Sequence, residues 1–218
     1  MDGSRAVIGD APKRREDRRF ITGAGRYLDD LRFDQLAHAV VLRSPRAHAR
    51  IVRLDAASAR AMPGVLAVLT ASEIAADGLN PLHPSVAANT ATGEPFSYVP
   101  QPLLADGEVR YVGEPVALIV AETRVQALDA AEAVAVEYAS LSAVTSPLAP
   151  GAERCLNWEA GDRAAVTAVF AAAAHIVALH LDNHRVVTNP IEPRGIVGDY
   201  DAAGGRYIAH VSAQSLHA

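Results

Sequence analysis

Apolar and polar residues alternate in short blocks along the first two thirds of the chain, and these blocks predict strands and helices in turn. Strands are predicted over residues 35–44, 51–55 and 65–70. Asp55 is placed to cap a short helix that stops at Pro63 and Gly64. Thr70 and Glu73 have the spacing of a capping box, which predicts a second helix after the third strand.

The same logic recurs further along the chain. Residues 116–122 form an apolar run typical of a buried strand, and Thr123 with Gln126 predicts another capped helix. Apolar residues then recur at near-helical spacing, at Val125, Leu128, Ala131 and Val134. A strand over residues 134–138 completes the second strand–helix unit. Two such units predict one small α/β domain that ends near Leu141.

Two segments outside this pattern are predicted to be irregular. Residues 78–107 contain five prolines and few periodic signals, so we expect a long surface loop of a kind that is often functional or partner-binding. The charged N-terminus ends in the run Arg14 to Phe20 and is interpreted as a solvated or docking arm. Gly23 and Gly25 mark a turn, because they lack the spacing and the preceding strand of a dinucleotide-binding loop.

The second half of the chain predicts an unfinished sheet. After an irregular linker, Asp162 is placed to cap a helix with one apolar stripe, formed by Val166, Val169, Phe170 and Ala173. An extended strand is predicted over residues 175–187, and a hairpin with a turn at Asp201–Gly205 follows. One helix and three strands bury too little apolar area to form the core of an independent domain. We therefore expect another chain, or more of the same domain, to cover the stripe and Val177.

Composition and charge narrow the class of protein. The net charge of −5 gives no reason to expect nucleic-acid binding, which requires a basic face. The one cysteine, Cys155, forms neither an internal disulfide nor a thiolate metal site by itself. No apolar run has the length of a signal sequence core or of a membrane span, so a soluble, cytoplasmic protein without an integral membrane segment is expected. His180 and His184 are interpreted as hydrogen-bonding residues rather than metal ligands.

The densest polar cluster is NHRVVTNPIEPRG, residues 183–195. Pro190 and Pro193 fix φ and push the residues before them into extended geometry, which holds the side chains in set directions. Glu192 and Arg194 are predicted to pair across this segment. Two interpretations stay open from the residues alone: a rigid structural corner braced by a salt bridge, which composition favours, or part of a reaction site.

Several segments in order resemble the large, molybdenum-carrying subunit of the molybdenum hydroxylases, the family of xanthine dehydrogenase, aldehyde oxidase and aerobic carbon monoxide dehydrogenase large chains. KRREDRRFITGAGRYLDDL is similar to the family's opening segment. HAVVLRSPRAHARIVRLDAASARAMPGVLAVLT resembles its first strand–helix units, and VRYVGEPVALIVAETRVQALDAAEAVAVEYASLSAV resembles the end of its α/β hammerhead domain. GDRAAVTAVFAAAAHIVALHLDNHRVVTNPIEPRGIVGDYD resembles the entry into its molybdopterin-binding domain.

The resemblance implies an α+β fold, with a hammerhead-type domain followed by the start of a molybdopterin-binding domain. The expected boundaries are an N-terminal arm over residues 1–19, the hammerhead domain over 20–141 and an incomplete molybdopterin-binding portion over 142–218. It also implies a molybdopterin cofactor in the complete assembly. The cofactor-contacting glutamine maps to Gln214, whose amide NH₂ is able to donate to an oxygen on the metal. The sequence departs from the family pattern at Leu216, which stands where a proline usually precedes His217.

Three functions follow from these observations. The first is the N-terminal fragment, or one chain of a split, molybdenum-dependent hydroxylase large subunit, which uses water as the oxygen source for an aldehyde, a heterocycle or CO. No residue here matches the family's catalytic glutamate, so no catalytic or metal-ligating residue is assigned, and the chain alone is expected to be inactive and to bind no cofactor. The second is a non-catalytic assembly module that docks flavin and iron–sulfur subunits in an oligomer. The third is a stand-alone α/β domain that binds a small ligand between its halves.

Overall fold

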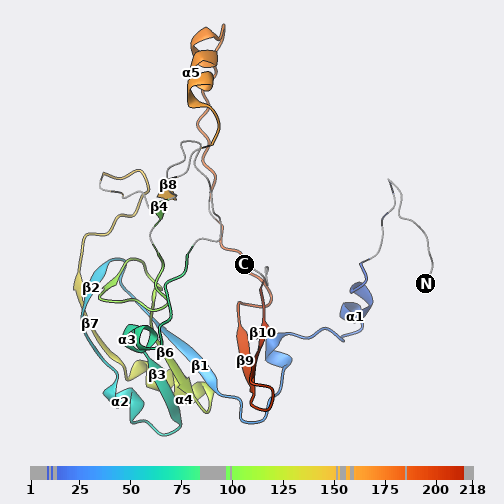
Figure 1. Ribbon diagram of the computed structural model, residues 1–218, viewed down its shortest axis with the longest axis vertical. Helices are drawn as coiled ribbons and strands as arrows, with labels where there is room; N and C mark the ends of the chain where they lie inside the picture. The colour runs from blue at the N-terminus through green and yellow to red at the C-terminus, as the bar shows by residue number, and fades with distance from the viewer. Residues whose placement is uncertain are drawn as a thin grey trace. The chain divides into compact units, whose positions relative to one another are not determined.

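The structure is a computed structural model whose ribbon is drawn in Figure 1. It describes residues 9, 11, 14–83, 97–98, 100–150, 152, 156–157, 160–184 and 186–213. The chain divides into two compact units. We call residues 35–181 the two-sheet unit, and residues 1–34 together with 182–218 the hairpin unit.

Two antiparallel three-stranded sheets form the main part of the two-sheet unit, and Figure 1 labels all of their strands except β5. The first has the order β1-β6-β3, formed by His38–Arg43, Pro115–Ala121 and Val65–Leu69. The second has the order β5-β2-β7, formed by Glu108–Val109, Ala49–Asp55 and Ala135–Ser140. The longer strands of both sheets lie where the sequence pattern predicts them, whereas the short strand β5 was not predicted; the mixed helix-and-sheet class is confirmed.

Strand β6 lies at the centre of the first sheet because it is apolar on both faces. Val116, Ala117, Ile119 and Ala121 are all fully buried. Ala117, Ile119 and Ala121 belong to the larger core cluster, whereas Val116 packs in a second cluster with Ala49, Ala105 and Val109. A strand buried on both faces reads as a continuous apolar run, which is how the sequence predicted it.

Three of the four helix caps that the sequence predicted precede the first three helices of this unit. The carboxylate of Asp55 accepts the Ala57 N–H at 2.9 Å where helix α2, Ala57–Arg60, begins. Thr70 and Glu73 form a reciprocal capping box at α3, Ala71–Ala76. Hydrogen bonds from the hydroxyl and the N–H of Thr70 lower the pKa of Glu73 to about 2. The Thr123 hydroxyl accepts the Gln126 N–H at the start of helix α4.

Helix α4, Arg124–Glu132, confirms the helix that the apolar spacing predicted. Of the four residues at that spacing, Val125 and Leu128 are 66% and 43% exposed, whereas Ala131 and Val134 are buried. The buried residues are Ala127, Ala130 and Ala131. Alanine faces let the helix backbone approach β6 closely, and that close approach leaves the larger side chains outside.

The end of the predicted surface loop is part of the core. Leu104 and Ala105 are 7% and 3% exposed, and the Ala105 N–H donates to the Pro115 carbonyl at 2.7 Å. The prediction of a surface loop over all of residues 78–107 is therefore wrong at its C-terminal end. Residues 84–96, which hold two of its prolines, lie outside the described residues.

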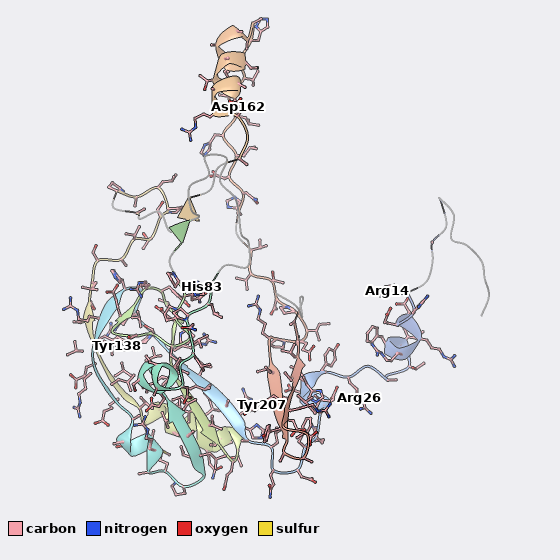
Figure 2. The ribbon with its side chains drawn as sticks, in the orientation of Figure 1. Arg14, Arg26, His83, Tyr138, Asp162 and Tyr207 are labelled. Carbon is pink, nitrogen blue, oxygen red and sulfur yellow. The ribbon has the colours of Figure 1, made fainter. Side chains whose placement is uncertain are left out.

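The segment from residue 160 to 184 confirms one prediction and contradicts another. Helix α5, Arg163–Ala172, begins at Asp162, whose carboxylate accepts the Ala165 N–H at 2.9 Å; Figure 2 labels this residue. The described residues of 175–187 form no strand, so the extended strand predicted there is wrong. A strand needs a neighbour to bond its N–H and C=O groups, and apolar alternation alone supplies none.

Short elements complete the chain. Strands β4, Ser97–Tyr98, and β8, Leu156–Asn157, pair with each other. The hairpin unit contains helix α1, Asp17–Ile21, a 3₁₀ turn η1, Leu28–Asp30, and the strands β9, Ile196–Asp201, and β10, Arg206–Val211. Among the described residues, no helix has the length and apolar character needed to cross a membrane.

Candidate functional site

The hairpin unit contains the polar corner and the strand that leads toward Gln214. Strands β9 and β10 pair antiparallel in unbroken register, from Arg206 opposite Asp201 to Val211 opposite Ile196. The ladder continues beyond the strands, because the Ser212 N–H donates to the Gly195 carbonyl at 3.1 Å. The backbone is thus held in place to within two residues of position 214.

The turn of this hairpin is held by Asp201. Its carboxylate accepts the N–H groups of Ala203 and Gly204 at 3.1 and 3.0 Å, and it pairs with Arg206 at 3.2 Å. The hydrogen bond from Gly204, followed by the bond from Arg206, lowers the pKa of the Asp201 carboxyl below its ordinary value. The predicted hairpin and its turn are therefore confirmed.

The hairpin makes two aromatic contacts, one between its strands and one with the N-terminal segment. Tyr200 and Tyr207 are cross-strand partners whose ring centroids lie 4.8 Å apart, and Tyr207, labelled in Figure 2, is 87% exposed. Phe33 contacts His210 with ring centroids 5.4 Å apart. The second contact joins the strand that leads to Gln214 to the N-terminal segment of the chain.

Glu192 makes the main polar contact at the corner. Its Oε1 accepts the Leu28 N–H at 2.7 Å, between residues 164 positions apart in the sequence. Leu28 begins the η1 turn, where N–H groups have no partner within the turn and favour an anion. The carboxylate of Glu192 therefore anchors the N-terminal segment to the corner.

Among the described residues, Glu192 and Arg194 form no ion pair, so the predicted pair across the corner is wrong. Glu192 is directed to a backbone N–H of the opening segment instead. The interpretation of the corner as a structural brace is supported by this contact. No local signal in the sequence could have found it, because the partner is a main-chain group in a distant segment.

A hollow of about 250 Å³ lies beside this contact, between residues 27–30 and residues 191–195. Gly195 borders it, and a Cβ at this position would approach the Leu28 side chain to 2.9 Å. The segments are therefore in close contact, and glycine permits this approach. The hollow is partly open to solvent, and two of its carboxylates are bonded to backbone groups: Glu192 accepts the Leu28 N–H, and Asp30 Oδ2 accepts the Tyr27 N–H at 2.9 Å.

Gln214, His217 and Cys155 lie outside the described residues. His180 and His184 are exposed. Within the part of the chain that the structure describes, no group of three or more His, Cys, Asp or Glu side chains is arranged to hold a metal ion.

The Glu192 contact leads to a prediction. We expect Glu192→Ala to increase hydrogen exchange at residues 27–30 and at the corner, because the Leu28 N–H loses a charged acceptor worth about 1–3 kcal/mol. Hydrogen exchange read by mass spectrometry measures this change. Arg194→Ala is the matched control, since it removes a neighbouring exposed side chain and leaves the Leu28 bond intact. Equal exchange in the two variants would contradict the anchoring role.

Comparison with known proteins gives the same order of segments. The family profile described as the aldehyde oxidase and xanthine dehydrogenase a/b hammerhead domain matches residues 22–142. The profile of the molybdopterin cofactor-binding domain matches residues 148–218. The two profiles together span most of the chain, with the hammerhead domain first.

Individual relatives agree with the profiles. The nicotine 6-hydroxylase large subunit of Paenarthrobacter nicotinovorans is 38% identical over 98% of this chain, and the carbon monoxide dehydrogenase large chain of Hydrogenophaga pseudoflava is 34% identical over 97%. The quinoline 2-oxidoreductase structure from Pseudomonas putida 86 is 38% identical over 95% of the chain, with a TM-score of 0.75. A Cu,Mo-CO dehydrogenase structure is 32% identical over 96%, with a TM-score of 0.78. The chain spans 27–28% of the length of these proteins.

Proposed function

Because the chain belongs to the aldehyde oxidase and xanthine dehydrogenase family of molybdenum hydroxylase large subunits, we propose that it supplies the first part of such a subunit. In this proposal it contributes the hammerhead domain and the opening of the molybdopterin-binding domain. The remaining part of that domain comes from further chain or from a separate polypeptide. The proposed domain boundaries lie after residue 19, between the arm and the hammerhead domain, and after residue 141, where the molybdopterin-binding portion begins.

The observation that carries this proposal is that the two matched domains follow each other in order along the chain. The chain corresponds to 27–28% of the length of its relatives. Exposed apolar surface in the second domain supports it. Val166, Val169 and Phe170 of α5 are 55%, 69% and 57% exposed, and Val177 is 91% exposed. Apolar surface of this extent marks an interaction site, so we propose that the rest of the domain or a partner chain covers it.

The complete assembly would hydroxylate an aldehyde or a heterocycle, or oxidise CO, with water as the source of oxygen. The molybdopterin cofactor supplies the redox chemistry in such an assembly. Gln214 is the residue of this chain that we assign to it, as an amide hydrogen-bond donor. The anchored corner and the continuous β9–β10 ladder would set the direction in which the backbone reaches this glutamine.

The 218 residues are expected to be inactive by themselves. Proton transfer in this reaction needs a positioned base, and the family uses a glutamate for it. No segment here matches the motif of that glutamate, so the base is assigned to chain beyond these residues. We also propose flavin and iron–sulfur subunits as partners in an oligomer, which would carry away the electrons of the reaction.

A second function is the assembly module, in which the chain only docks the partner subunits. The exposed arginines of the arm favour it. Arg15, Arg18 and Arg19 are exposed around the short helix α1, and Arg19 lies 4.9 Å from the ring centroid of Phe20, which is 53% exposed. A mixed cationic and aromatic surface of this kind is typical of protein interfaces.

Co-expression tests the proposal. The purified 218-residue chain should contain no molybdenum by metal analysis and should turn over neither aldehydes nor purines. Co-expression with a polypeptide that carries the rest of the molybdopterin-binding domain, and with the flavin and iron–sulfur subunits, should yield a complex that contains molybdenum. Turnover by the isolated chain would overturn the assignment as an incomplete subunit. Co-purification with the partner subunits but without molybdenum would favour the assembly module.

A further inference from the structure

His48 is a titratable side chain that the proposed function does not use, and both of its ring nitrogens contact acceptors. Nδ1 lies 2.6 Å from the Ser142 carbonyl oxygen, and Nε2 lies 2.9 Å from Oε1 of Glu108. A carbonyl and a carboxylate cannot donate a hydrogen bond. A neutral imidazole has one N–H, whereas an imidazolium has two, so only the protonated ring satisfies both contacts.

The two contacts join three different parts of the two-sheet unit. His48 directly precedes β2, Glu108 begins β5, and Ser142 follows β7 by two residues. A backbone hydrogen bond adds a further link between the same segments, because the Leu141 N–H donates to the His48 carbonyl at 3.0 Å. His48 thus holds the first residues of the segment that leaves the sheet, residues 141–150, which we call the exit segment.

Charged side chains near the pair come from β2, from β5 and from the residue that follows β5. Glu108 faces the ring from β5, and Arg110, which follows that strand, lies 3.9 Å from the Glu108 carboxylate. Arg50 on β2 acts on Glu108 through its charge. Leu141 and Ser142 bring no titratable side chain. The hydrogen bond to the Ser142 carbonyl, followed by that to Glu108, raises the pKa of His48 above its ordinary value of 6.5, while Arg110 opposes this shift. The pKa of Glu108 is lowered, first through its bond to His48, so both partners favour the charged pair.

We propose that His48, Glu108 and the Ser142 carbonyl form a proton-dependent latch, which holds the exit segment on the β5-β2-β7 sheet when His48 is charged. This latch is a property of the two-sheet unit and holds whether or not the chain works with a molybdopterin cofactor. The exit segment joins the two matched domains, so the latch would regulate how freely the chain leaves the first of them.

The direction of the pH dependence follows from linkage. The pKa of His48 is higher when the latch is closed than when it is open, where the ring has its ordinary value. The latch is therefore fully formed from pH 4.5, the ordinary pKa of Glu108, up to pH 6.5, and it is lost as the pH rises through the raised pKa of His48. The protection factor falls in total by the ratio of the acid constants of His48 in the open and the closed latch. This ratio is about tenfold for each unit by which the two pKa values differ.

Two measurements on the full chain test the latch. An NMR titration of the histidine rings should show His48 titrating above 6.5. Hydrogen exchange, corrected for its intrinsic pH dependence, should show residues 141–150 losing protection over the same pH range. The size of this loss should match the measured difference between the pKa of His48 and its ordinary value. Agreement between the pKa displacement from NMR and the loss of protection from hydrogen exchange would support the latch. A pH-independent exchange profile would overturn it.

Three variants sharpen the test. Glu108→Gln should lower the pKa of His48 and move the loss of protection to lower pH. His48→Gln should abolish the pH dependence, because glutamine does not titrate in this range. His38→Gln is the matched control: it removes a histidine from β1, in the other sheet, and should leave the profile of residues 141–150 unchanged. A pH-dependent loss that persists in His48→Gln would also overturn the proposal.

Discussion

Ile119→Ala is expected to lower the free energy of unfolding by about 3–4 kcal/mol, within the range of about 2–5 kcal/mol for isoleucine truncation in cores. Ile119 is fully buried in the central strand β6, between β1 and β3. Alanines supply most of its buried neighbours in the larger core cluster. Small side chains on a paired strand and a capped helix have little freedom to move inward, so most of the cavity would stay open.

Urea unfolding followed by far-UV circular dichroism measures this loss. Leu66→Ala is the matched control, because Leu66 lies on the neighbouring strand β3 and is 57% exposed. Its truncation should cost roughly 1 kcal/mol or less, since most of the side chain remains in water. Similar losses in both variants would mean that the first sheet does not have the tightly packed core described here.

Gly64→Ala is expected to cost about 2–3 kcal/mol, which is large for a single added methyl group. Gly64 has φ of +78°, a left-handed conformation that costs a residue with a Cβ about 1–2 kcal/mol. An added Cβ would also lie 2.0 Å from Nε2 of Gln126. That side chain would have to move and give up the hydrogen bond from the Thr123 hydroxyl, worth about 1 kcal/mol.

A control and a double-mutant cycle separate these two costs. Gly107 has φ of +68° with nothing within 4 Å of an added Cβ, so Gly107→Ala reports the backbone cost alone. In a Gln126→Ala background the collision at Gly64 is absent, and the cost of Gly64→Ala should fall toward that of Gly107→Ala. If the substitutions at Gly64 and Gly107 cost the same in the unaltered chain, the contact with Gln126 has no energetic weight.

Local signals predicted most of the two-sheet unit. The strands beginning near residues 38, 65 and 115 follow from apolar runs and alternation, and the caps at Thr70 and Asp162 follow from side chains that bond to N–H groups within three residues. Such interactions lie within a few positions of each other in the chain. They therefore leave a pattern that is visible without knowledge of the fold.

The errors arose where a distant partner decides the outcome. The sequence predicted helix α4 but not which of its residues are buried; these are alanines, because the distance to β6 determines which side chains fit. Apolar alternation over residues 175–187 predicted a strand, yet alternation describes which side faces a core and supplies no neighbouring strand. Ala105 is buried against Ala49, Val109 and Val116, which belong to three strands that the proline-rich pattern around it does not indicate.

The sequence by itself determined the longer strands of the two-sheet unit, the hairpin, the caps and, through the resemblance of its segments, the family. The tertiary structure decided the roles of the two carboxylates that hold distant segments. Glu192 is bonded to the Leu28 N–H, and Glu108 is paired with His48. These partners are 164 and 60 residues apart. Only chain folding brings such groups within hydrogen-bonding distance, and the strength of a hydrogen bond depends on that distance and not on sequence spacing.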